Sequence, residues 1–329
     1  MVHSQMFRYV IRRLLFMIPT FLGISILVFA LLHASGDPIS LIRLASPTVD
    51  AATLDNIRAY YGLDKPVPEQ YLIWLTNFLR FDLGESYRFH TKVNFMIGAW
   101  AFETIKLQLV ALAIALSIAI PLGIRSAIKQ YSKGDMAVTA FSLFGISMPP
   151  FWFGVILIII FSFYLNVLPP GGAYGGSNLW PVFGIKNFYL DAIVHLIMPS
   201  IVVAYVWLAL YFRLLRANLL NIIKDDYILA ARASGIKERV INYRYALKMA
   251  FRPLLTFTGV RLGLVIAGVP MTETVFNWPG LGLLFVDSAL SLDFPIVMGI
   301  IMVVTLFMMV SNLIVDLLYA VIDPRVRLV

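Results

Sequence analysis

The chain has 329 residues, of which 60% are apolar and 13% are charged, and it contains no cysteine. Soluble domains are roughly 45–50% apolar and about 25% charged, so this composition excludes an ordinary soluble protein and indicates a polytopic membrane protein. The absence of cysteine excludes disulfides and thiol chemistry, and the formal net charge of +8 has to be explained by where the basic residues lie.

Six apolar stretches are long enough to cross a bilayer, which takes roughly 20 residues in a helix. The first follows Arg12 and Arg13, is longer than the apolar core of a signal peptide, and has no small-residue cleavage site behind it. We therefore expect it to be retained as a helix. The prediction is an all-α membrane protein with six transmembrane helices, near residues 9–32, 104–124, 136–165, 193–215, 254–275 and 296–320.

A polar segment, residues 33–100, separates the first two spans and is too long for a simple loop. Its pattern predicts one short helix over 50–61, stopped by Gly62, and a second over 68–81 with Pro68 near its start. One face of the second helix carries an aromatic and apolar stripe, formed by Tyr71, Trp74, Leu75 and Phe78. Such a stripe either lies on the membrane surface or packs on the rest of the segment.

Lys and Arg are concentrated in the N-terminus, residues 125–135, residues 213–252 and the C-terminus. The other connections between the predicted spans carry a small excess of negative charge. Positively charged connections mark the cytoplasmic side of a membrane protein, so both termini are predicted to be cytoplasmic. The positive excess is then a topology signal, which removes nucleic acid as a partner.

Gly and Pro cluster in two predicted extracytoplasmic connections, at 169–172 and 277–282. These residues force non-helical backbone, which at membrane depth is tolerated only against protein or a water-filled cavity. Apolar residues surround the second cluster, which makes it our candidate for a pathway or gate region, with Phe276, Trp278, Pro279 and Gly280 as its residues. Simple turns at the membrane surface are the alternative.

The motifs of common catalytic and metal sites do not occur in the sequence. It has no P-loop, no H-E-x-x-H, no G-x-S-x-G and no Cys ligand set. Its four His are scattered, and His195, at the start of a span, is expected to be a packed or interfacial side chain. We therefore expect a chain that is not an enzyme, has no metal site and binds no cofactor or nucleotide of its own.

Two ionisable residues, Arg261 and Asp316, lie clearly inside predicted spans. Each is roughly 10–12 Å from the cytoplasmic end of its helix, at about 1.5 Å per residue. Lone charges in lipid cost at least about 2.5 kcal/mol, so equal depth and opposite sign predict an ion pair between spans five and six. A gating or substrate contact is the alternative. One buried acid with a partner also argues against a proton-coupled secondary carrier, which would bury a chain of acids.

The cytoplasmic segment 213–253 is basic and helix-prone, and it has no reason to lie in lipid. Asp225 and Asp226 precede a run of strong helix formers, Gly235 stops or turns that helix, and a second amphipathic helix is predicted to run to Pro253. Small and apolar side chains at the tip are expected to be exposed for a partner groove: Tyr227, Ala231 and Ile236. A solvated hairpin without a partner is the alternative.

This segment resembles the EAA loop of ABC importer permeases, in the form typical of the oligopeptide/dipeptide/nickel family of binding-protein-dependent permeases. The family pattern A-R-A-x-G-[LI]-x-E-R is matched by Ala231, Arg232, Ala233, Gly235, Ile236, Glu238 and Arg239, with Leu229 where the general motif has Glu. Further matches cover essentially the whole chain, at residues 8–14, 61–66, 82–86, 147–151, 168–172, 273–282 and 323–325. The long segment after the first span is similar to that of the B-type permease subunit of the family. Arg261 is a departure, because the family usually has a neutral residue at this position.

The resemblance implies a type I ABC importer fold with both termini inside, divided into residues 1–32, an extracytoplasmic segment 33–100 and a five-helix core 101–329. The coupling loop would lie at about 219–253 and would contact the ATPases through Tyr227, Ala231, Arg232, Gly235, Ile236, Glu238 and Arg239.

The same resemblance implies a multi-pass subunit in a prokaryotic cell membrane, surrounded by membrane lipid, that forms half of a translocation pathway. Its implied partners are a second, C-type permease subunit, two cytoplasmic ATPase subunits that use ATP and Mg, and an extracytoplasmic solute-binding protein. Peptides are the expected solutes. Oligosaccharide or nickel import within the same family, and a stand-alone secondary carrier of a different class, are the alternatives.

Overall fold

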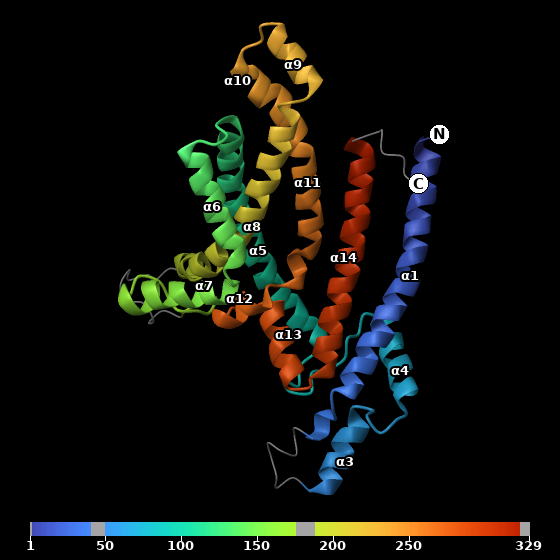
Figure 1. Cartoon of the computed structure of the whole chain (residues 1–329). Helices are drawn as coiled ribbons and strands as arrows, with labels where there is room; N and C mark the ends of the chain where they lie inside the picture. Colours follow the sequence, from blue (N-terminus) through green and yellow to red (C-terminus); the bar gives the residue numbers. More distant parts are fainter. Residues whose placement is uncertain (1, 41–49, 176–187, 323–329) are drawn as a thin grey trace. The chain divides into compact units, whose positions relative to one another are not determined.

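The computed structural model describes residues 2–40, 50–175 and 188–322, and these ranges are helical nearly throughout (Figure 1). Within them, five helices are long and apolar enough to cross a membrane, or six if one bent pair of helices counts as a single span. The predicted all-α polytopic membrane fold is confirmed. The chain divides into two compact units, residues 1–103 with 280–329, and residues 104–279.

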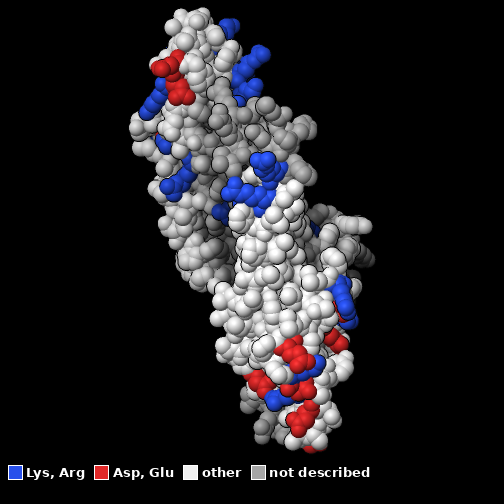
Figure 2. Space-filling view, turned by 90° about the vertical axis from the view of Figure 1, so that its right-hand side faces the viewer, with Lys and Arg blue, Asp and Glu red and all other residues white. Residues whose placement is uncertain are grey.

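The first unit is built on two long apolar helices, α1 and α14, which pack along each other. It contains α1 (Val2–Ala34), α3 (Ala51–Tyr60), α4 (Val67–Leu79), α13 (Leu281–Leu290) and α14 (Phe294–Ile322). Exposed Arg8, Arg12 and Arg13 lie near one end of α1, and most of the helix beyond them is apolar. Figure 2 shows a band of white surface without charged side chains, which separates a group of basic side chains near mid-height from mixed acidic and basic side chains at the lower end. This distribution agrees with the predicted cytoplasmic N-terminus.

The two short extracytoplasmic helices form where the sequence predicts them. Asp50 is extended and precedes α3, and Gly62, with φ +69°, follows it. Pro66 precedes α4, whose first turn holds Pro68. The aromatic stripe of α4 packs on α1, since the Tyr71 hydroxyl lies 2.8 Å from Ser25 Oγ and the Phe78 ring centroid lies 5.3 Å from that of Phe21. The first span therefore covers the stripe, an arrangement that neither predicted alternative included.

The second unit surrounds α8, whose inner face carries the fully buried side chains of Tyr211, Phe212 and Leu215. The helix α5 (Val93–Ile128) begins in the first unit and continues into this one. The other elements are α6 (Lys133–Ser147), α7 (Pro150–Leu157), the π-helical η1 (Ile158–Tyr164), α8 (Phe188–Ile222), α9 (Asp226–Ala233), α10 (Glu238–Val240), the π-helical η2 (Ile241–Ala246), α11 (Leu247–Leu264), the 3₁₀ turn η3 (Val265–Ala267) and α12 (Pro270–Val275).

The third predicted span, over 136–165, consists of two helices joined at a sharp bend. The helix breaks between α6 and α7, and the two parts meet at 103°. The cause is local, because a residue before proline is driven out of the helical region. Met148 and Pro149 each precede a proline and are extended, with ψ 124° and 131°, and Pro150 then begins α7.

The fifth span also differs from its predicted bounds of 254–275. The helix runs without interruption from Glu238 to Leu264, with Pro253 inside it, and η3 extends it to Ala267. Gly268, with φ +76°, ends it, so α12 is a separate helix. The second cytoplasmic helix, predicted to end at Pro253, is therefore the beginning of the fifth span.

Candidate functional site

The cytoplasmic segment between α8 and α11 forms a compact helical tip at the end of these two helices (Figure 1). Asp225 is extended, with ψ 147°, and α9 starts at Asp226. After α9, Gly235 has φ +77°; its N–H donates to Arg232 O at 3.1 Å, and the N–H of Ile236 donates to Ala231 O at 3.3 Å. This pair of bonds is the Schellman arrangement, which needs a left-handed residue where Gly235 stands.

The two faces of α9 have opposite environments. Ile228 and Ala231 are buried in the core cluster that also contains Leu219 and Ile241. Half-buried Ile236 packs on the same cluster. The prediction that Ala231 and Ile236 are exposed is therefore wrong in this structure, because at 3.6 residues per turn position 231 shares the inner face with 228. Tyr227 is exposed, as predicted.

The outward face of α9 is small and apolar, and the sequence analysis missed it. Leu229, Ala230 and Ala233 are all exposed, and Ala233 lies four residues after Leu229 and three after Ala230, so the three share one side of the helix. The signal was present in the sequence, since the inner residues Ile228 and Ala231 are three apart and the outer ones fall opposite to them. The sequence alone does not indicate which side of α9 meets the core.

An ion pair bridges the turn that ends α9. The Arg232 guanidinium donates to the Glu238 carboxylate, with Nη2 at 3.3 Å from Oε2, and this contact raises the pKa of Arg232. Both side chains are exposed, as is that of the adjacent Arg239. The structure thus joins Arg232 and Glu238 across Gly235 and leaves their other faces available to a partner.

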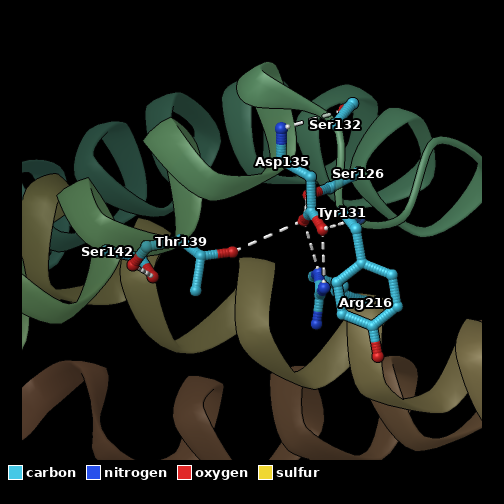
Figure 3. Close-up of polar contacts among 7 residues, drawn as sticks. All are labelled: Ser126, Tyr131, Ser132, Asp135, Thr139, Ser142 and Arg216. Carbon is cyan, nitrogen blue, oxygen red and sulfur yellow. Dashed lines mark hydrogen bonds and ion pairs between the residues drawn. The ribbon is translucent and has the colours of Figure 1, made fainter.

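A buried charge cluster lies below the tip and joins α5, α6 and α8 (Figure 3). The Asp135 carboxylate is bound by Arg216 in a bidentate manner, with Nε–Oδ1 2.7 Å and Nη2–Oδ2 2.8 Å. It also accepts hydrogen bonds from the Ser126 hydroxyl and from the Tyr131 N–H, the latter at 2.9 Å. Asp135 is almost completely buried, so these contacts replace its hydration.

Sequence reasoning counted Asp135 as part of a charged loop and missed this cluster. A signal was available, because Ser132 and Asp135 have the S-x-x-D spacing of a helix start. The Ser132 hydroxyl accepts the N–H of Asp135 at 3.2 Å and caps α6. The partner Arg216 is 81 residues away in the sequence, and no local pattern identifies it.

The predicted pathway region packs tightly within the second unit. Phe276 is buried among Leu157, Met198 and Val202, and Trp278 packs with Leu107 and Ala173. The Lys106 ammonium lies 5.0 Å from the Trp278 ring centroid. Pro279 ends this unit, and Gly280 begins the chain's return to the first unit, just before α13. The pathway role of Phe276, Trp278, Pro279 and Gly280 stays a prediction.

The first Gly/Pro cluster contacts Phe276, the residue just before the second cluster. The Gly172 N–H donates to Phe276 O at 2.7 Å, and a Cβ atom on Gly171 would lie only 2.2 Å from the same oxygen. Gly171 is therefore required for the close approach of the two backbones. This contact fixes the first cluster against the residue that precedes the second.

Glu273 anchors the irregular stretch that follows the fifth span. It is completely buried, and Oε1 accepts the Val269 N–H at 3.1 Å and the Thr104 hydroxyl at 3.3 Å. Gln108, one turn further along α5, donates to Val265 O at 2.6 Å. Glu273 thus fixes the end of this span to α5.

The two intramembrane charges have local partners. Asp316 accepts a hydrogen bond from the Tyr9 hydroxyl at 2.7 Å and lies 3.4 Å from Arg13 Nη2, all in the first unit. Arg261 belongs to the second unit, where its guanidinium lies 5.1 Å from the Phe257 ring centroid. The Arg261–Asp316 pair stays a prediction, but Asp316 no longer needs it to balance its charge.

His195 has the packed role that its position predicts. It is buried, and its Nδ1 lies 2.9 Å from Asp191 O on the preceding turn of α8.

Among the residues that the structure describes, no group of three or more His, Cys, Asp or Glu could hold a metal ion. The matching residues 323–325 lie outside the described ranges.

Comparison with known proteins gives the chain's family. The model described as "Binding-protein-dependent transport system inner membrane component" matches residues 119–328, and the corresponding N-terminal model matches residues 6–93. The chain is 40% identical to the oligopeptide transport system permease protein AppB of Bacillus subtilis (strain 168), over 97% of this chain and 99% of that protein.

Two further relatives show the same full-length similarity. The dipeptide transport system permease protein DppB of Escherichia coli (strain K12) is 35% identical, and the di/tripeptide transport system permease protein DppB of Pseudomonas aeruginosa (strain UCBPP-PA14) is 36% identical. Each match covers 98% of this chain and 99% of the relative. With its membrane-spanning helices and both family matches, the chain belongs to the inner membrane components of binding-protein-dependent transport systems, the permease subunits of ABC importers.

Proposed function

We propose that this chain forms half of the membrane pathway of a peptide importer, together with a second, C-type permease subunit. Two cytoplasmic ATPases that bind ATP and Mg supply the energy, and an extracytoplasmic binding protein delivers the solute. This chain is expected to bind no cofactor of its own. Di- or oligopeptides are the proposed solutes, because the three relatives described above are named for them. Oligosaccharides and nickel are the alternatives.

The observation that carries the coupling assignment is the outward face of α9. Leu229, Ala230 and Ala233 are exposed at the end of a helix pair, where water rather than lipid is expected. A short helix with small apolar residues on one side fits a groove of a partner protein. The Schellman turn at Gly235 and the Arg232–Glu238 pair hold this face in one orientation.

The tip is connected to the membrane helices by two rigid links. On one side α9 follows α8, which the Asp135–Arg216 pair ties to α6. On the other side α10 continues through η2 into α11 as one helical element. A displacement of α9 by closing ATPases would therefore move these helices as a body, which is one of the common forms of switching transition.

The experiment places a bulky residue on this face. Ala230→Trp should fill the space that the ATPase groove occupies, so peptide uptake by the reconstituted importer falls strongly, while membrane insertion persists. Lys133→Trp is the matched control, because it adds the same bulk to an exposed cytoplasmic position at the start of α6. Equal uptake by Ala230→Trp and wild type would contradict the coupling assignment.

A second measurement separates the importer from a stand-alone carrier. The purified chain is reconstituted in liposomes alone and with its full set of partners, and uptake of a labelled dipeptide is measured with and without ATP. We expect uptake only with all subunits and ATP. Uptake by the chain alone would favour the secondary carrier, and ATP-driven uptake of another solute class instead would correct the substrate.

A further inference from the structure

A shallow groove lies at the cytoplasmic end of α5, where this helix meets the coupling segment. It encloses about 480 Å³. Its polar side consists of Arg125, Lys129 and Tyr243, and its apolar side includes Ile120, Pro121 and Ile124. None of the residues that line it is acidic. The groove therefore combines two cations and a phenol with an apolar surface.

Within the part of the chain that the structure describes, the two cations of the groove have no counter-charge. Among the described residues, neither Arg125 nor Lys129 makes an ion pair or a side-chain hydrogen bond. The buried acid of this region, Asp135, is already bound by Arg216. Cations in the last turn of a helix are favoured by the helix dipole, but the dipole explains neither the groove nor its third polar group.

The depth of the groove matches the boundary between lipid headgroups and acyl chains. Arg125 lies in the last turn of α5, at the predicted cytoplasmic surface. Ile120 is five residues earlier, which places it about 7.5 Å deeper in the membrane at about 1.5 Å per residue. The cations thus lie at headgroup level, and the apolar side lies where hydrocarbon begins.

We propose that this groove binds one anionic phospholipid. Arg125 and Lys129 pair with its phosphate, the Tyr243 hydroxyl donates a hydrogen bond to it, and an acyl chain lies on Ile120, Pro121 and Ile124. Basic pockets between helices on the cytoplasmic side of a membrane protein have this chemistry. An acidic protein segment would satisfy the cations, but it would leave the apolar side against lipid without using it.

The site would connect lipid composition to energy coupling. Tyr243 belongs to η2, which continues from α10 and packs with α9, whereas Arg125 lies in the last turn of the membrane helix α5 and Lys129 directly follows that helix. A lipid that contacts both holds the coupling segment against α5. Anionic lipid is then expected to raise the uptake obtained for each ATP hydrolysed, whatever solute the importer carries.

The test measures lipid retention by the full chain in detergent, by native mass spectrometry. Phosphatidylglycerol and phosphatidylcholine with identical acyl chains are offered in equal amounts. Wild type should retain phosphatidylglycerol preferentially, and Arg125→Gln with Lys129→Gln should weaken that preference by roughly 30-fold, at about 1 kcal/mol for each cation near the surface. Tyr243→Phe should give a smaller loss.

The matched control removes the same charge elsewhere. Arg8→Gln with Arg12→Gln neutralises two exposed cytoplasmic cations on α1, and it should leave the preference unchanged. Excess inorganic phosphate should not displace the lipid, because it lacks the acyl chain; displacement would mean that the groove is a phosphate site.

Three further results would overturn the proposal. Wild type could retain both lipids equally, or the α1 control could lose as much preference as the groove variant. Alternatively, the groove variant could keep its lipid preference and lose the second permease subunit on purification, in which case the groove is a protein contact.

Discussion

At the scale of single residues, a few positions decide how segments of this permease are held. Gly235 supplies the left-handed backbone that ends α9, and Asp316 ties α14 to α1 through Tyr9 and Arg13. Their importance comes from geometry in the first case and from charge in the second, and separate substitutions can test the two.

The first prediction concerns Gly235, where a Cβ atom would meet nothing within 4 Å. Any defect of a substitution must therefore come from the backbone, since φ is +77° and a left-handed L-residue is strained by roughly 1–2 kcal/mol. Gly235→Val should reorient α9 and lower peptide uptake while ATP hydrolysis persists. Gly235→Asn is the control, because Asn tolerates this conformation. A Val variant as active as the Asn variant would show that the turn does not matter.

The second prediction decides which cation balances Asp316. In double-mutant cycles on the solubilised chain, Arg13→Gln and Asp316→Asn should couple by at least about 0.5 kcal/mol, because neighbouring charges interact. Arg261→Gln and Asp316→Asn should be additive if Arg13 is the partner. The midpoint of thermal unfolding is the readout. Coupling to Arg261 and none to Arg13 would instead support the pair predicted from the sequence.

At the scale of elements, the sequence predicts which stretches are helices better than it predicts where they bend. The spans and the helices α3 and α4 follow from apolar length and from Gly and Pro at their ends. The bend at Met148–Pro149–Pro150 was hidden by the apolar residues on both sides, although each residue before a proline is forced out of the helix. Pro253 shows the opposite error, because it lies inside α11, whereas the sequence analysis predicted that a helix ends there.

The third prediction follows from this bend. Replacing Pro149 and Pro150 together by Ala removes the local cause, so α6 and α7 should become more nearly collinear and the distance between their far ends should increase. The chain has no cysteine, so Ala137→Cys and Tyr164→Cys introduce the two thiols to which spin labels attach, and no native cysteine has to be removed. Electron paramagnetic resonance in nanodiscs then measures the distance. An unchanged distance would mean that tertiary packing, rather than the proline pair, sets the angle.

At the scale of the whole molecule, composition predicts the class of protein, and motif spacing predicts the partner, but neither predicts the long-range contacts. The motif residues Ala231 and Ile236 were correctly placed at the cytoplasmic tip and wrongly placed on its surface, since one sequence does not say which helix face meets the core. Arg216 and Asp135 meet only because α8 packs on α6. Such contacts determine how a displacement of the tip reaches the membrane.

The last prediction tests that connection. Arg216→Gln leaves the buried Asp135 without its cation, and breaking a buried pair destabilises by about 3–5 kcal/mol. Arg216→Lys keeps the charge but loses the bidentate geometry, so it should be intermediate. Arg213→Gln is the matched control, an exposed cation one turn earlier on α8. We expect the unfolding temperature and the uptake per ATP to fall in the order Arg213→Gln, Arg216→Lys, Arg216→Gln.

If Arg213→Gln is as damaging as Arg216→Gln, general charge on α8 matters and the link to α6 does not. If stability falls while uptake per ATP is unchanged in the surviving protein, the pair holds the fold and carries no displacement.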